Sequence, residues 1–285
     1  MEKLIDMHMH TIYSDGEMTP LELALLVKES GITTFSITDH DNIAGNIELL
    51  KTFNGHEMTF ITGIEVSGYI DKGELHILGY GIDLNNQALH DYMNKKHEAA
   101  INKVKYITEL LAHRNQFIFT GEELDQLYHP IGDVGRPAIA RLMVKHGYVE
   151  NFREAFTKYL IPLNKEADQV NYKLTEDEVI HLILQAGGVP VLAHPILMEK
   201  DDLELEEYVI RLIKKGLMGI EVFHSDHSLE YQKKMYDLAI KHNLLYSGGS
   251  DYHGPNTKAI VHLGTGIDYN LNIKELSLVN YIKSR

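Results

Sequence analysis

The sequence predicts an α/β barrel that is interrupted once by a helical insertion. Short apolar runs alternate with helical segments over residues 1–84 and again over 172–285, a pattern typical of parallel sheets and barrels. Between them, residues 85–171 show helical periodicity and no convincing strand. We therefore expect a discontinuous barrel domain, 1–84 with 172–285, and a helical cap domain at 85–171.

The first part of the barrel begins with a strand at 4–7. Thr19-Pro20-Leu21-Glu22 is a capping box with proline at the first helical position, and it opens a helix that runs to Gly31. Asp41 or Asn42 is expected to cap the next helix. Further strands are expected at 33–38, 59–62 and 75–80.

The insertion is expected to contain helices at 86–113, 122–128, 137–145 and 152–159. The alternation resumes at Thr175-Glu176-Asp177-Glu178, a second capping box whose helix ends at Gly187-Gly188. The elements expected after it are strands at 189–193, 219–223 and 244–247 and helices at 203–215 and 229–242.

Composition narrows the classes of function. A formal net charge of −14 argues against bulk electrostatic attraction to nucleic acid or an anionic membrane, although bound metal ions would reverse the local sign. Because the chain has no cysteine, nitrogen and oxygen donors must hold any metal. No apolar run suits a membrane span and no signal-peptide pattern precedes the first strand, so a cytoplasmic protein is expected.

Histidines and carboxylates stand at or near the ends of most predicted strands. In a βα barrel these ends open onto one rim, where active sites lie. One His-x-His pair is weak evidence in a chain with 17 histidines, but the joint placement favours a divalent metal site. The candidate ligands are His8, His10, Asp15, His40, Glu65, His76, His194, Asp251 and His253.

Five motifs carry a family resemblance. They are Asp6-Met7-His8-Met9-His10 with Ser14-Asp15-Gly16, Thr38-Asp39-His40-Asp41, Gly63-Ile64-Glu65, Leu192-Ala193-His194-Pro195 and Gly249-Ser250-Asp251-Tyr252-His253-Gly254. On these motifs the chain resembles the PHP (polymerase and histidinol phosphatase) superfamily.

The resemblance implies a distorted (β/α)7 barrel with two or three divalent metal ions, Mn, Fe or Zn. The implied ligand sets are His8, His10, Glu65 and Asp251 for one ion, Asp15, His40 and His253 for a second, and bridging Glu65 with His76 and His194 for a third.

The helical insertion resembles that of one group within the PHP superfamily. Gly135-Arg136-Pro137 and the residues after it resemble the insert of PHP phosphoesterases that act on nucleotides: 3′,5′-nucleotide bisphosphate phosphatases and 5′-to-3′ exonucleases of short RNA. The planar guanidinium of Arg136 suits a second phosphate, and the alternative is a surface salt bridge. The expected substrates are 3′,5′-bisphosphonucleotides, with AMP or phosphate as product, and short 5′-phosphorylated RNA or DNA oligonucleotides.

Two further residues receive roles. Asp39 is expected to orient a ligating imidazole, and His227 is either a phosphate contact, a leaving-group acid or a solvated loop histidine. Three other functions stay open: a histidinol-phosphatase-like enzyme for another small phosphorylated metabolite, an amidohydrolase in which Glu65 bridges the metals, and a non-catalytic PHP module.

Overall fold

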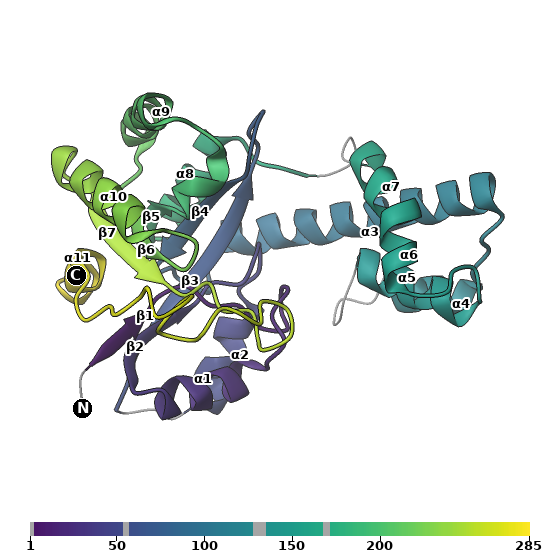
Figure 1. Ribbon diagram of the computed structural model, residues 1–285, viewed down its shortest axis with the longest axis horizontal. Coiled ribbons are helices and arrows are strands. Elements are labelled where there is room, and N and C mark those ends of the chain that lie inside the picture. Colours follow the sequence, from purple (N-terminus) through teal and green to yellow (C-terminus); the bar gives the residue numbers. More distant parts are fainter. Residues whose placement is uncertain (1–2, 54–56, 128–134, 168–171) are drawn as a thin grey trace. The chain divides into compact units, whose positions relative to one another are not determined.

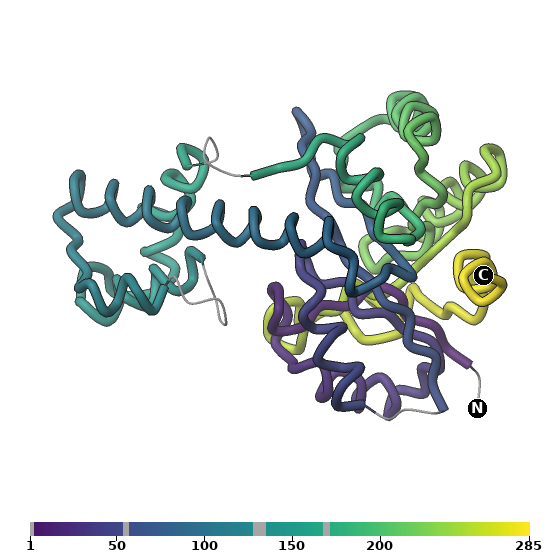
Figure 2. The backbone as a smooth tube through the Cα atoms, turned by 180° about the vertical axis from the view of Figure 1, so that it is seen from behind, coloured from purple at the N-terminus to yellow at the C-terminus, as the bar shows by residue number. Residues whose placement is uncertain are grey.

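The computed structural model describes residues 3–53, 57–127, 135–167 and 172–285. The chain forms two compact units, Met1–His90 with Lys173–Arg285, and Asp91–Tyr172. The chain passes from the first unit into the second within helix α3 (Gln87–Asn115), whose path can be followed in Figure 2.

The first unit contains one seven-stranded sheet with the strands in sequence order (Figure 1). They are β1 (Leu4–Asp6), β2 (Ile32–Ile37), β3 (Thr59–Gly68), β4 (Leu75–Tyr80), β5 (Val189–Leu192), β6 (Gly219–His224) and β7 (Leu245–Gly249). The chain after β1 lies beside the end of β7, because Met7 donates its N–H to Gly248 O at 3.1 Å. The sheet is therefore a nearly closed barrel, which confirms the predicted fold class.

β4 departs from the parallel pattern of the barrel, because it runs antiparallel to both β3 and β5. Only residues 69–74 join β3 to β4, whereas a parallel crossover needs a dozen or more residues. β3 is also longer than predicted, so Glu65 lies inside the strand, opposite Leu78, instead of after its end. Because β4 is reversed, His76 near its start reaches the same rim as His194 after β5.

Helices cover the outside of the sheet (Figure 1). They are α1 (Pro20–Glu29), α2 (Ala44–Thr52), α8 (Glu176–Gln185), α9 (Asp202–Lys215), α10 (Leu229–Lys241) and α11 (Ser277–Lys283). Both predicted capping boxes form, at Thr19 with Glu22 and at Thr175 with Glu178. The sequence did not predict α11 or the short 3-10 helix Pro195–Met198.

The second unit is helical and has its own core. Its described elements after α3 are α4 (Gly121–Leu127), α5 (Arg136–Lys145), α6 (Phe152–Glu154), a π-helical turn at Ala155–Leu160 and α7 (Ile161–Glu166). The last three form one continuous helical stretch, longer than the predicted 152–159. Ile139 and Met143 are fully buried in a cluster formed only by residues of this unit. No helix in the described ranges is long and apolar enough to cross a bilayer.

Ile139→Ala should lower the free energy of unfolding by about 2–5 kcal/mol, because it leaves a cavity in the helical core. The metal content of the protein should not change, since the barrel core is separate. Denaturant unfolding and elemental analysis check both points. Ile118→Ala is the control, because Ile118 is 67% exposed and its loss should cost little. A fall in metal content for Ile139→Ala would contradict the independence of the two cores.

Candidate metal centre

Main-chain hydrogen bonds on both sides fix the segment that carries His8 and His10. Thr38 donates its N–H to Met9 O at 2.9 Å, and His10 donates to Tyr252 O at 2.9 Å. Side chains alternate along an extended chain, so His8 and His10 point to the same side. Both residues are buried.

The carboxylate of Glu65 lies at the centre of the cluster and is fully buried. Around its Oε2 lie His8 Nε2 at 3.1 Å, His10 Nε2 at 3.2 Å and His40 Nδ1 at 3.3 Å. Around its Oε1 lie His194 Nε2 at 2.8 Å and His76 Nδ1 at 2.9 Å. Each oxygen thus faces its own group of imidazoles, which suits a carboxylate that bridges two cations.

Asp251 completes the group around Oε2 of Glu65. Its Oδ1 lies 3.1 Å from His10 Nε2 and 3.4 Å from His8 Nε2. Asp251 has a φ of +57°, a left-handed conformation that is uncommon for residues other than glycine. A Cβ at Gly249 would lie 2.2 Å from His8 N, so glycine is needed for β7 to approach this close.

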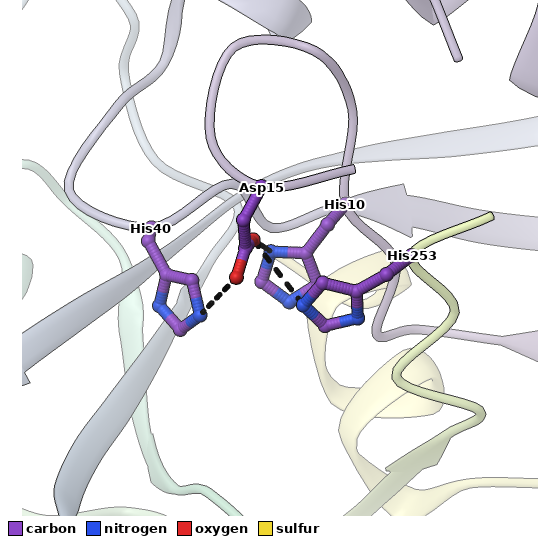
Figure 3. Close-up of side chains that lie close together, drawn as sticks. All are labelled: His10, Asp15, His40 and His253. Atoms are coloured by element: carbon purple, nitrogen blue, oxygen red, sulfur yellow. Dashed lines mark ion pairs between the residues drawn. The ribbon is translucent and has the colours of Figure 1, made fainter. Parts of the chain in front are cut away.

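Asp15 forms a further group at the edge of the cluster. Figure 3 shows its carboxylate between His40 and the rings of His10 and His253. Its Oδ1 lies 3.2 Å from His253 Nε2, and its Oδ2 lies 3.8 Å from His40 Nε2. The structure therefore brings all nine predicted ligands together in one cluster.

The donor set fits divalent metal ions. It offers only nitrogen and oxygen, as Mn, Fe and Zn accept. His10 Nε2 and His40 Nδ1 are buried beside carboxylate oxygens, but neither forms a well-aligned hydrogen bond among the described residues. In two other candidate ligands, a neighbour holds the ring nitrogen that faces away from the cluster: His253 Nδ1 lies 2.8 Å from Asp251 O, and His8 Nδ1 lies 2.9 Å from a carboxylate oxygen of Glu221. Such contacts fix the tautomer that leaves a lone pair for a metal.

The pKa directions reflect this crowding of charges. Burial would raise the pKa of Glu65, but the surrounding imidazoles, foremost His40 and His8, hold it well below its usual range. Burial lowers the pKa of His40 to about 4. For His10, the carboxylates of Asp251 and Glu65 outweigh burial and raise the pKa to about 9.

Asp39, Arg136 and His227, for which the sequence predicts roles other than metal binding, have different surroundings. Asp39 accepts hydrogen bonds from Thr11 N–H at 2.6 Å and Ser14 Oγ at 2.8 Å, and Ser14 Oγ in turn lies 3.2 Å from His10 Nδ1. Within the described residues, Asp39 forms no direct hydrogen bond with an imidazole and is linked to His10 through Ser14. Arg136 belongs to the helical unit, where its guanidinium lies 5.9 Å from the Phe156 ring centre.

His227 is not a solvated loop residue, because it is fully buried. Its Nδ1 donates to Val222 O at 2.9 Å, and burial lowers its pKa to about 4. A neutral, buried ring is poorly suited to contact phosphate or donate a proton, so the placement argues against the predicted role.

Sequence reasoning missed three residues of the cluster. Glu221 and His224 come from β6, and His224 Nε2 lies 3.4 Å from Asp251 Oδ2. Lys258 forms an ion pair with the same oxygen of Asp251. The signal for His224 was its place at the end of β6, the criterion that selected other ligands, whereas Glu221 lies inside the strand.

This barrel, with buried imidazoles and carboxylates gathered at one rim, is typical of metal-dependent hydrolases. The PHP domain family matches residues 6–184. The chain is 30% identical over 252 residues to the 3′,5′-nucleoside bisphosphate phosphatase of Chromobacterium violaceum, covering 88% of this chain and 87% of that protein. It is 29% identical over 254 residues to the 5′-3′ exoribonuclease Rnm of Escherichia coli, covering 88% and 86%.

A solved structure supports the same assignment. The protein of Bifidobacterium adolescentis assigned as a metal-dependent phosphoesterase superposes with a TM-score of 0.74 at 26% identity, covering 99% of this chain and 96% of that one. The chain belongs to the PHP domain family. It is a metal-dependent phosphoesterase, as the sequence predicted.

Glu65→Gln should lower both metal content and turnover, because a neutral amide bridges cations poorly. Elemental analysis after gel filtration measures the first effect. Glu206→Gln is the matched control, since Glu206 Oε1 also meets an imidazole, His242 Nε2 at 2.7 Å, outside the cluster. Normal metal stoichiometry in Glu65→Gln would remove Glu65 from the centre.

The stabilisation that metal confers should grow as pH rises from 6.5 to 9. In metal-free protein, the folded-state pKa of His10 is raised to about 9 from an unfolded value of about 6.5. Its stabilising contribution is therefore complete below pH 6.5 and is lost as pH rises through 9. Metal binding instead requires neutral imidazoles. Thermal midpoints with Mn²⁺ and with chelator should diverge over this range, and a constant difference would refute the linkage.

Proposed function

We propose that this phosphoesterase hydrolyses phosphate monoesters of small nucleotides, with 3′,5′-bisphosphonucleotides as the main substrates and AMP and phosphate as products. The observation that carries the proposal is the Glu65 carboxylate with imidazoles around both oxygens, which suits adjacent cations at a phosphate. The substrate class follows the similarity over 88% of the chain to a 3′,5′-nucleoside bisphosphate phosphatase.

We propose two or three divalent ions, Mn, Fe or Zn, in the centre. Bound ions lower the pKa of water and neutralise charge on phosphoryl oxygens. The residues that would hold them are His8, His10, Asp15, His40, Glu65, His76, His194, Asp251 and His253. Asp39 accepts hydrogen bonds from the hydroxyls of Thr11 and Ser14 and so holds the loop between them. This loop lies next to His10 and Asp15, so Asp39 helps to fix the positions of both.

Arg136 is proposed to bind the phosphate that does not react. A guanidinium offers two parallel N–H donors to phosphate oxygens, and its cation–π contact with Phe156 supports the side chain without using those donors.

Short 5′-phosphorylated oligonucleotides are the second candidate substrates. The similarity to a 5′-3′ exoribonuclease favours them, and they too carry a phosphate that Arg136 can bind. Release of phosphate or of mononucleotides separates the two activities.

A substrate panel tests the proposal. Phosphate release is measured from adenosine 3′,5′-bisphosphate and histidinol phosphate, release of mononucleotides from a 5′-phosphorylated dinucleotide, and hydrolysis of an amide and a lactone by formation of their acids. Highest kcat/KM for the bisphosphate or the dinucleotide supports the proposal. A preference for histidinol phosphate, or hydrolysis of the amide or lactone alone, would overturn it.

Arg136→Ala should reduce kcat/KM for the bisphosphate by about 2–4 kcal/mol, the range for losing a charge-assisted contact. An aryl phosphate offers no second phosphate, so its hydrolysis should change little. Arg141→Ala removes the same charge from the same helix and serves as the control. Equal loss for both substrates would assign Arg136 a structural role, and no loss for either would remove it from recognition.

A further inference from the structure

We propose that Glu221 is a positioning residue that holds both His8 and His194 in the geometry needed to bind metal. The inference rests on the proposed metal centre and assigns a role to a carboxylate outside its nine ligands. Glu221 lies in β6 and is fully buried.

The two oxygens of Glu221 have different partners. Oε1 lies 2.9 Å from His8 Nδ1, and Oε2 accepts the backbone N–H of His194 at 2.7 Å. One side chain thus joins the segment after β1 to the segment after β5. No covalent or secondary-structure link of the described chain joins these two segments directly.

The contact with Oε1 decides the state of the His8 ring. A carboxylate only accepts hydrogen bonds, so Nδ1 of His8 carries a proton. When the ring is neutral, Nε2 then has the lone pair. This atom lies 3.1 Å from Glu65 Oε2 and 3.4 Å from Asp251 Oδ1, on the side where the other candidate ligands converge. Glu221 therefore selects the tautomer of His8 that can ligate.

The contact with Oε2 holds an unusual backbone. His194 has φ +20° and ψ +67°, at the edge of the left-handed region that residues other than glycine avoid. Such a conformation persists only when surrounding contacts impose it. With its N–H held by Glu221, the His194 ring places Nε2 at 2.8 Å from Glu65 Oε1.

These two contacts explain why the residue must be a carboxylate. Two N–H groups converge on its two oxygens, whereas glutamine can accept at only one end and presents N–H donors at the other. Glu221→Gln must therefore either leave His194 N–H facing a donor or force His8 into the tautomer with its proton on Nε2. Glu221→Asp keeps both acceptors but is one methylene shorter, so it cannot reach both partners.

The test compares the wild-type protein with Glu221→Gln and Glu176→Gln. Glu176 accepts from Tyr208 Oη at 2.6 Å and Lys215 Nζ at 2.8 Å, so its variant loses structural hydrogen bonds in the same unit. Zn²⁺ affinity is measured by competition with a chelator, and stoichiometry by elemental analysis. In zinc-loaded protein, the downfield imidazole N–H resonance of His8, assigned with His8→Ala, reports the contact with Glu221.

We expect Glu221→Gln to bind Zn²⁺ about 10–100-fold more weakly, as when a partner of a ligating imidazole is lost, with the same stoichiometry at saturation and with the resonance of His8 shifted or lost. Glu176→Gln should keep wild-type affinity and resonance. If Glu221→Gln does not fold, Glu221→Asp must show the same weakening.

Two results would overturn the inference. One is unchanged affinity with the resonance retained. The other is loss of one whole zinc equivalent with the remaining affinity unchanged, which would make Glu221 itself a ligand beside His8 and His224. The proposed centre is tested separately: if His8→Ala retains full zinc affinity, the centre is misassigned, whatever Glu221 does.

Discussion

The carboxylate of Glu65 is the group on which the site depends, because it is fully buried and imidazoles surround both of its oxygens. An isolated buried charge is unfavourable unless opposite charges or metal ions compensate it. The structure meets this requirement by bringing imidazoles from several strands to one point. Glu65 is held at this point because its strand, β3, is paired on both sides, with β2 and β4.

Three further buried carboxylates hold the segments that carry the candidate ligands, and each accepts a backbone N–H. Asp6 accepts from Ser250 at 2.9 Å, Asp39 from Thr11 at 2.6 Å and Glu221 from His194 at 2.7 Å. Each acceptor thus fixes a ligand or the neighbour of one. Hydrogen bonds to charged groups are stronger than neutral ones, so these carboxylates can keep irregular segments in place at the rim.

The sequence predicts well what depends on local signals. The capping boxes at Thr19 and Thr175 form as expected, and the ligand-type residues near strand ends gather at one rim because strand ends meet there. It does not predict the direction of β4, because the predicted strand before it ends at residue 62, whereas β3 extends to Gly68 and leaves only residues 69–74 for the connection. Glu221 was overlooked for another reason: its partner His8 is 213 positions away, and no local pattern reveals that contact.

Electron paramagnetic resonance of the Mn²⁺-loaded protein tests the central claim most directly. A carboxylate shared by two Mn²⁺ ions couples their electron spins, so wild-type protein should show an exchange-coupled spectrum at saturating metal. Glu65→Gln should replace it with the six-line signal of isolated ions. A six-line spectrum alone in fully loaded wild-type protein would contradict the account, because it would mean that Glu65 joins no pair of metal ions.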